Sequence, residues 1–336
     1  MSAESLLNCL SKALKARSGL SEPLHESAFR LFNGFLEGEP DLVADLYGRT
    51  VVLYNFAEEP LRAQPKLQTA LEFYRCQMPW LQAVLLKTRA APDQQGRRGI
   101  LLLGEQPDRK IRENGVWYAL DLTLNRDASF YLDTRALRAW AKQNLAGLRV
   151  LNTFAYTGSL GVAALAGGAS RVVQLDLSRR FLALAQTSCT LNDFPIQKTD
   201  YIHADFFPGV ASLKRQGEQF DCVFLDPPFF SSTAGGRVDL VTQAGRLINK
   251  VRPLVSDGGW LAVINNALFL SGVHFMALLE ALCADGYLHI DTLLPVPEDC
   301  SAYPDTRVRS LPVDPAPFNH STKIVLLKVK RKLVNL

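Results

Sequence analysis

The sequence predicts an α/β protein in which a smaller N-terminal α/β domain precedes a doubly wound, mainly parallel sheet of seven strands. Apolar strand-like runs alternate with helix patterns from residue 149 to residue 329, which is the rhythm of βαβ units. The stretch 150–178 contains a strand, a glycine turn, a helix, a second strand and an acid in that order. Polar residues also stand at four predicted strand ends: Asn152, Asp176, Asp205 and Asp226.

Composition indicates an ordinary globular protein. The 336 residues are 48% hydrophobic and 21% charged, enough for two domains with a sizeable core. No apolar run has the length of a membrane span and no signal-peptide pattern opens the chain, so we expect a cytoplasmic protein. The six cysteines and five histidines show no metal-ligand spacing, and no metal is expected.

The net charge of +4 is mildly basic, and its local Lys and Arg clusters are compatible with a phosphate-bearing partner such as RNA. Each cluster also suits an ordinary solvated surface. The pattern does not distinguish a monomer from a homodimer.

Residues 1–115 predict a small α/β domain of mixed topology. We expect a leading helix within residues 1–20 and a second helix over 64–80. The expected strands are Val51–Tyr54 and Ala83–Lys87. Residues 116–136 alternate in polarity and predict a linking β-hairpin between the domains. The larger domain then occupies residues 137–336, beginning with a helix.

The larger domain repeats strand and helix to its end. Ser178 is a suitable N-cap for the helix that follows the second strand. The predicted strands are Arg149–Phe154, Arg171–Leu177, Tyr201–Ala204, Asp221–Leu225, Trp260–Ile264, Leu288–Leu294 and Lys323–Val329. The last two are joined by a Pro-rich loop without a helix pattern, which permits an antiparallel final hairpin.

The glycine turn after the first of these strands predicts a nucleotide-like cofactor on a Rossmann-like sheet. Gly158 allows a ligand close to the backbone, and Asp176, about 18 residues later, is placed to bind ribose hydroxyls. A dinucleotide fingerprint would have glycine where this chain has Tyr156, so a cofactor without phosphates, such as S-adenosylmethionine, is favoured. A βαβ unit with no nucleotide is the plainer alternative. Asp205, with the backbone at Phe206, is assigned to the adenine edge.

The most specific motif is Asp226-Pro227-Pro228-Phe229. Two prolines fix the chain in an extended course and remove two N–H donors, so carbonyls point outward. An acceptor carboxylate beside an aromatic face suits a flat heterocycle: Phe229 or Phe230 would stack on a base that Asp226 orients or deprotonates. The alternative is a Pro-Pro loop with two core phenylalanines. The fifth strand is followed by Asn265-Asn266 and no thiol, which favours a nitrogen target over carbon 5 of a pyrimidine.

These residues resemble the bacterial class I S-adenosylmethionine-dependent methyltransferases that modify bases of large-subunit ribosomal RNA. The likeness covers Arg30–Gly34, Ala44–Gly48, Arg112–Gly115, Phe130–Arg135, Leu151–Gly158 and Asp226–Phe229. The family includes cytosine-C5 enzymes with a cysteine after the fifth strand and a guanine-N7 enzyme with an Asn-Asn pair there, which Asn265-Asn266 resembles. Phe229 occupies a position where relatives often have a small residue, and the loop 299–320 matches nothing we can place.

The resemblance implies the class I seven-stranded sheet and a set of site residues. Asp133 and Arg135 would help to close the site near the cofactor. The full cofactor-binding set is Asp133, Arg135, Asn152, Phe154, Tyr156, Gly158, Asp176, Leu177, Asp205, Phe206 and Asp226, and the catalytic set is Asp226, Pro227, Phe229 and Asn265.

The function expected from this reading is methyl transfer from S-adenosylmethionine to a base nitrogen of RNA, most simply a guanine of large-subunit ribosomal RNA. Three alternatives stay open. A methyltransferase could instead modify a small molecule or a protein side chain. A nicotinamide-dependent oxidoreductase shares the first βαβ unit, although Tyr156 argues against it. A non-catalytic RNA-binding module would bind RNA without turnover.

Overall fold

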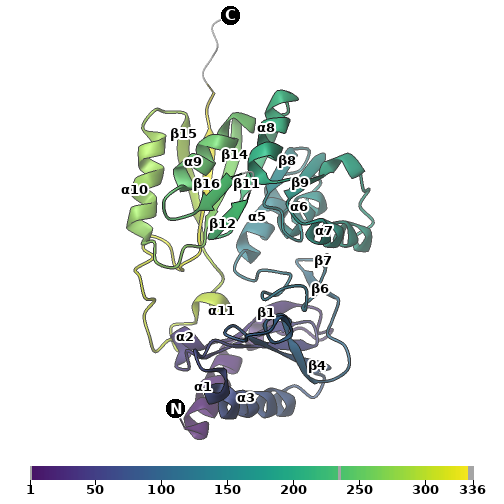
Figure 1. Ribbon diagram of the computed structural model, residues 1–336, viewed down its shortest axis with the longest axis vertical. Coiled ribbons are helices and arrows are strands. Elements are labelled where there is room, and N and C mark those ends of the chain that lie inside the picture. Colours follow the sequence, from purple (N-terminus) through teal and green to yellow (C-terminus); the bar gives the residue numbers. More distant parts are fainter. Residues whose placement is uncertain (1, 234–235, 332–336) are drawn as a thin grey trace, which may run out of the picture. The chain divides into compact units, whose positions relative to one another are not determined.

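The computed structural model describes residues 2–233 and 236–331, and the chain forms two compact units (Figure 1). The N-terminal unit runs to Asp133 and also includes Pro297–Leu311, whereas the larger unit comprises Thr134–Val296 and the chain after Pro312. The sequence placed the division at residues 115–136. In the structure the linking segment up to Asp133 belongs to the N-terminal unit. This unit also includes residues 299–311 of the loop that the sequence analysis could not assign.

The N-terminal unit is a five-stranded mixed sheet, in the order β1-β2-β3-β4-β5, with helices packed against it. Only β3 and β4 pair in parallel. The strands are β1 (Ala28–Asn33), β2 (Leu42–Tyr47), β3 (Thr50–Asn55), β4 (Ala83–Thr88) and β5 (Ile100–Leu103). The helices are α1 (Ala3–Ala16), α2 (Gly34–Glu37), α3 (Gln64–Gln77) and α4 (Gln94–Arg98). Leu6, Leu10 and Ala13 of α1 are buried against this core, as the helical spacing requires.

The predicted linking hairpin is shorter than expected and lies earlier in the chain. β6 (Lys110–Glu113) pairs with β7 (Val116–Ala119), and no strand follows before Thr134. Side-chain turns replace it, because Asp121 Oδ1 accepts from the Thr123 amide and Asn125 Oδ1 from the Asp127 amide. Such local hydrogen bonds compete with a strand ladder.

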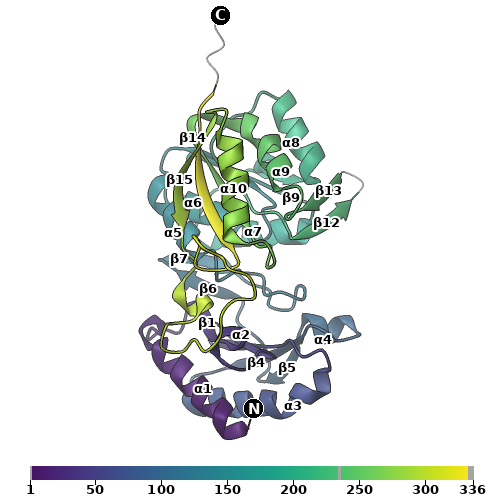
Figure 2. The same ribbon diagram turned by 90° about the vertical axis from the view of Figure 1, so that its left-hand side faces the viewer.

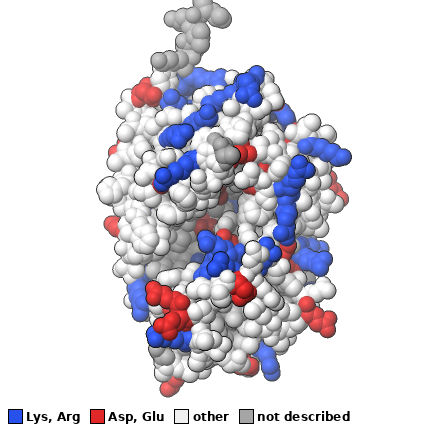
Figure 3. All heavy atoms as spheres, in the orientation of Figure 1, with Lys and Arg blue, Asp and Glu red and all other residues white. Residues whose placement is uncertain are grey.

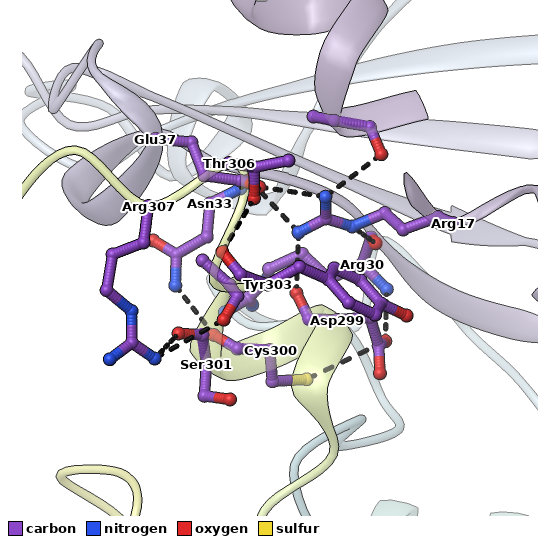
Figure 4. A network of polar contacts seen from close by, with 12 residues as sticks. Arg17, Arg30, Asn33, Glu37, Asp299, Cys300, Ser301, Tyr303, Thr306 and Arg307 are labelled. Atoms are coloured by element: carbon purple, nitrogen blue, oxygen red, sulfur yellow. Dashed lines mark hydrogen bonds and ion pairs between the residues drawn. The ribbon is translucent and has the colours of Figure 1, made fainter. Parts of the chain in front are cut away.

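The returning segment 297–311 is bound to the N-terminal unit through a buried polar network (Figure 4). It contains α11 (Glu298–Ser301). Arg17 is fully buried, pairs with Glu37 at 2.9 Å and donates to the Asp299 carbonyl. The Asp299 carboxylate accepts from the Arg30 amide, and the Asn33 side chain donates to the Cys300 carbonyl. Residues 299–311 of the loop that matched no pattern are therefore part of the N-terminal fold, whereas the rest of that loop belongs to the larger unit.

The larger unit is the predicted seven-stranded sheet, in the order β10-β9-β8-β11-β14-β16-β15. All seven strands predicted from the sequence form, and β16 runs antiparallel to both neighbours, as the final hairpin permits. They are β8 (Arg149–Thr153), β9 (Arg171–Asp176), β10 (Tyr201–His203), β11 (Phe220–Leu225), β14 (Val255–Asn265), β15 (Leu288–Leu294) and β16 (Lys323–Val329).

Helices cover both faces of this sheet. On one side lie α5 (Arg135–Asn144), α6 (Ser159–Ala166) and α7 (Arg179–Leu191). On the other lie α8 (Phe206–Arg215), α9 (Ala244–Val251) and α10 (Gly272–Cys283), packed over a continuous apolar core (Figure 2). One element was not predicted: a hairpin of β12 (Phe230–Thr233) and β13 (Gly236–Asp239) follows the Pro-Pro motif. No helix among the described residues is both long and apolar enough to span a bilayer.

Replacing Glu37 with Gln tests the buried network. The substitution leaves the buried Arg17 guanidinium without its carboxylate, and breaking a buried pair in this way costs about 3 kcal/mol or more. We expect the free energy of unfolding of the N-terminal unit, measured by urea denaturation, to fall by that amount. The matched control is Glu59→Gln, which removes the exposed pair with Arg62. Equal effects of the two substitutions would contradict the structural role given to the network.

Candidate active site

The loop after β8 is held in an unusual backbone conformation. Phe154, Tyr156 and Gly158 all have positive φ, at 52°, 51° and 76°. Left-handed backbone at non-glycine residues costs of order 1–3 kcal/mol and occurs where surrounding structure imposes it, often at functional sites. Gly158 has no alternative, because a Cβ there would lie 2.4 Å from the Cβ of Ala185 in α7.

A buried amide pair supports this loop from below. Gln174 in β9 accepts from Asn152 Nδ2 at 2.8 Å and donates to the Gly158 carbonyl at 3.3 Å. A Cβ at Gly161 would lie 2.2 Å from Gln174 Nε2, so the first turn of α6 rests directly on this amide. Asn152 is itself buried, and its Oδ1 has no hydrogen-bond partner among the described residues. An orphaned buried acceptor is a position that a water molecule or a ligand donor would satisfy.

Asp176 lies at the end of β9 and joins the loop after β8 to the turn after β9. Its carboxylate accepts from the Tyr156 amide and from the Ser178 amide, both at 2.8 Å. Burial raises the pKa of Asp176, and the two amide hydrogen bonds oppose that rise. A carboxylate has about four lone-pair positions, so two remain for ribose hydroxyls. Leu177, next to it, exposes 55% of its surface and offers an apolar contact.

Two aromatic pairs involve the loop that follows β8. Tyr156 meets Phe181 of α7 edge to face at 4.5 Å between centroids. Phe154 stacks on Phe206 at 4.5 Å with an interplanar angle of 19°. Phe206 is buried in the apolar core and Phe154 packs against that core, so this stack supports the loop from within. Asp176 and the glycine turn remain the groups expected to bind an adenosine. A bulky ring at Tyr156 leaves no bare backbone for a pyrophosphate.

Asp205, predicted to contact adenine, has a structural task in addition. Its Oδ1 caps α8 by accepting from the Phe207 amide at 3.1 Å, and its Oδ2 accepts from the Thr233 hydroxyl of the β12–β13 hairpin. The hairpin also packs on the Phe207 ring, because a Cβ at Gly236 would lie 2.4 Å from it. Thr233 is a residue that the sequence analysis missed.

The Asp226-Pro227-Pro228-Phe229 corner begins where β11 ends. Thr153 of β8 donates from its hydroxyl to the Phe224 carbonyl, which fixes the adjacent strand ends together. Pro227 is buried, whereas Pro228 is exposed and Phe229 exposes 48% of its surface. The alternative in which this Phe belongs to the core is therefore excluded by its exposure.

Asn265 serves the turn after β14. The side chain is fully buried; its Nδ2 donates to the Leu240 carbonyl at 3.3 Å and its Oδ1 accepts from the Ala267 amide at 3.0 Å. The sequence analysis placed this amide in the catalytic set, but both of its polar ends are engaged within the protein. Its neighbour Asn266 is the exposed member of the pair.

A buried lysine supports the same turn. Lys323 of β16 pairs with Asn265 in the sheet register and donates from Nζ to the carbonyls of Ala267 and Ser321, at 3.1 and 2.6 Å. Burial lowers the pKa of Lys323 to about 8. The sequence analysis did not identify this residue, since one lysine at the start of a strand carries no distinguishing signal.

The strand order brings these loops to one edge of the sheet. β9, β8, β11 and β14 are consecutive neighbours and mutually parallel, so the loops after them emerge at the same edge. At about 4.8 Å per strand, the ends of β9 and β11 lie about 10 Å apart, a span suited to a nucleoside and a second ring. Asp133 and Arg135 flank the start of α5.

Thiol and metal chemistry have no visible support at this edge. Cys222 is buried within β11, where burial raises the pKa of its thiol, and Cys189 contacts the Tyr201 hydroxyl. Within the described ranges, no group of three or more His, Cys, Asp or Glu side chains could hold a metal ion. On the face drawn in Figure 3, Lys and Arg side chains gather in several groups, and Asp and Glu side chains lie beside some of them.

Comparison with known proteins gives consistent matches. A family model described as S-adenosylmethionine-dependent methyltransferase matches residues 30–311. Ribosomal RNA large subunit methyltransferase I of Photobacterium profundum is 29% identical over 83% of this chain and 68% of its own length. The enzyme of that name from Yersinia pseudotuberculosis is 32% identical over 66% of this chain, which spans only 56% of that relative.

Solved structures agree on the fold. A methyltransferase crystallised with SAH (S-adenosylhomocysteine) has a TM-score of 0.83 and 21% identity, covering 98% of this chain and 82% of its own. An S-adenosylmethionine-dependent methyltransferase from Streptococcus mutans has a TM-score of 0.82 and 20% identity with the same coverage. The predicted class I fold and S-adenosylmethionine cofactor are confirmed.

Replacing Asp176 with Asn tests the cofactor site. The amide cannot accept as strongly from hydroxyls, and a hydrogen bond to a charged group contributes about 1.5–3 kcal/mol. We therefore expect the dissociation constant for S-adenosylhomocysteine, measured by calorimetry, to rise at least ten-fold. The matched control is Asp193→Asn, an exposed position after α7. Unchanged affinity in Asp176→Asn would remove this carboxylate from the site.

Lys323 predicts a pH dependence of stability. Its folded pKa of about 8 lies below the ordinary value of 10.5, so the unfolded chain binds more protons between these values and stability rises with pH there. Relative to Lys323→Met, the wild-type protein should gain about 1–3 kcal/mol from pH 8 to 10.5. Denaturant melts across this range check it. A difference that stays constant with pH would contradict the burial of a charged amine.

Proposed function

Because the chain belongs to the S-adenosylmethionine-dependent methyltransferase family, we propose that it methylates a base nitrogen of RNA, specifically a guanine of large-subunit ribosomal RNA. The names of the curated relatives support ribosomal RNA as the substrate class. Several groups of Lys and Arg on one face are compatible with a phosphate backbone.

The observation that carries the proposal is the rigid corner at the end of β11. Asp226 presents a carboxylate, and Phe229 presents a ring that is about half exposed, one strand away from the loop that would hold the cofactor. The two intervening prolines fix the course of the chain between them. A flat base can be oriented by the carboxylate and stacked on the ring at once, whereas a flexible side-chain substrate needs no aromatic platform.

The bound cofactor supplies an electrophilic methyl carbon on a sulfonium. The chain's residues orient the acceptor: Phe229 stacks on the base, and Asp226 with the Pro227 carbonyl binds its N–H groups. The nitrogen lone pair forms the new N–C bond as the C–S bond breaks, leaving a thioether. Positioning of this kind is the main catalytic contribution available to a displacement with no covalent enzyme intermediate. A base within a duplex must first be flipped out.

The choice of nitrogen follows from the missing thiol. Attack through carbon 5 of a pyrimidine needs a thiolate nucleophile, and no cysteine lies on the loops after β8, β11 or β14. N7 of guanine has an in-plane lone pair and loses no proton, so it requires orientation but no general base. Asn265 supports the turn after β14 in this scheme, and exposed Asn266 is the amide available to the base edge.

Asp226→Ala tests the corner. Loss of the orienting carboxylate should abolish transfer of label from S-adenosylmethionine to ribosomal RNA prepared from a strain lacking the gene, because the lone pair is no longer aligned with the methyl carbon. The dissociation constant for S-adenosylhomocysteine should change only a few-fold. Mass spectrometry of the product RNA identifies the nucleotide and the ring atom.

Glu280→Gln, on the exposed side of α10, serves as the charge-matched control and should retain activity. Normal turnover in Asp226→Ala would reject the role given to the carboxylate. Methyl transfer to metabolites or proteins, with none to RNA, would replace the proposed substrate.

A further inference from the structure

Exposed aromatic side chains follow two adjacent strands of the larger sheet. After β11, Phe230 exposes 53% of its surface; after β14, Phe269 exposes 72% and its neighbour Leu268 exposes 42%. The two strands pair in register up to Leu225 and Val263, so both loops leave the same edge. Large apolar side chains exposed together on a soluble protein mark a binding surface more often than chance.

The loop that carries Phe269 is anchored at both ends. Asn265 and Lys323 hold its first residues, and the Leu270 amide donates to the Ala267 carbonyl. Ser271 then caps α10, and the Gly272 amide donates to the Asp314 carbonyl. The exposed ring is thus presented by a fixed turn, which lowers the entropy lost when a ligand stacks on it.

Phe230 is presented with a positive charge. The Arg237 guanidinium lies over its ring at 5.2 Å, across the β12–β13 hairpin. The hairpin is fastened by the Leu240 amide donating to the Phe229 carbonyl, and by Thr233 to Asp205. Arg237 also pairs with Asp239 at 3.0 Å, and 57% of its side chain stays exposed. A ring with an exposed arginine beside it offers a stacking face next to a cation that a phosphate can share, which is the recurrent chemistry of single-stranded nucleic-acid binding.

We infer that Phe230, with Arg237, and Phe269 stack the unpaired nucleotides that flank the target base of the RNA. This inference rests on the proposed function. The two rings follow the two adjacent strand ends that bear the Asp226 corner and Asn266, and we therefore place the neighbours of a base held at that corner on these rings. A protein partner would cover the rings without needing their π faces, and Arg237 would be dispensable.

The test compares variants in the full-length protein. Phe230→Ala, Phe269→Ala and the double variant remove the stacking faces, Phe269→Trp keeps one, and Phe269→Leu keeps only apolar surface. Leu61→Ala, at an exposed leucine of the N-terminal unit, is the control. The substrate is ribosomal RNA from a strain lacking the gene. The readouts are KM and kcat for RNA, the affinity for S-adenosylhomocysteine, and quenching of a single-stranded oligoribonucleotide that contains 2-aminopurine.

Each single Ala variant should raise KM for RNA at least five-fold, the lower limit for one base–aromatic stack, with a smaller change in kcat and unchanged cofactor affinity. Phe269→Trp should keep the wild-type KM for RNA and the wild-type quenching of 2-aminopurine. Phe269→Leu should resemble Phe269→Ala in both measurements. An unchanged KM in the double variant, or wild-type behaviour of Phe269→Leu, would overturn the inference while leaving the proposed function intact. If the wild-type protein methylates no RNA, both fall.

Discussion

The hydrogen bond from the Tyr156 amide to the Asp176 carboxylate is the constraint on which the site depends. It ties the loop after β8 to the end of β9 and holds Tyr156 in left-handed backbone that its side chain would otherwise disfavour. With Phe154 and Gly158 also left-handed, the loop turns tightly at the sheet edge, and Ala155, Thr157 and Gly158 are buried within the turn. The same carboxylate keeps lone pairs for a ligand, so the interaction that shapes the loop also places the acceptor.

A second link joins the start of α8 to the β12–β13 hairpin. Asp205 caps α8 and also receives the Thr233 hydroxyl from the hairpin that follows Phe229. The position of the hairpin is therefore coupled to the residue expected at the adenine edge.

The sequence predicts the parts of the fold that depend on local pattern and misses those that depend on distant contacts. All seven strands of the larger sheet follow from apolar runs and glycine or proline boundaries. The segment Pro297–Leu311 was unassigned because the residues it contacts are far away in the sequence. Asp299 of this segment, for example, accepts from the Arg30 amide, 269 positions earlier. The β12–β13 hairpin was missed because its strands are four residues long and mixed in polarity.

The same reasoning applies within the site. Asp176, Gly158 and the Asp226 corner could be named from spacing, because a strand end fixes which edge of the sheet they reach. Spacing does not fix the direction of a side chain in the turn that follows a strand. The sequence therefore could not show that Asn265 is buried and that its neighbour Asn266 is exposed. Gln174 did carry a signal, as a polar residue within an otherwise apolar strand.

The buried Lys323 shows why a costly group is retained at this position. Its amine loses hydration and gains two carbonyl partners, with no carboxylate among its hydrogen-bond partners. An apolar side chain would stabilise the sheet more but would leave the Ala267 carbonyl without this donor. Because that carbonyl belongs to the turn between Asn265 and Phe269, the lysine fixes the loop after β14. The buried amine thus lowers stability at one residue while it holds this loop in one conformation.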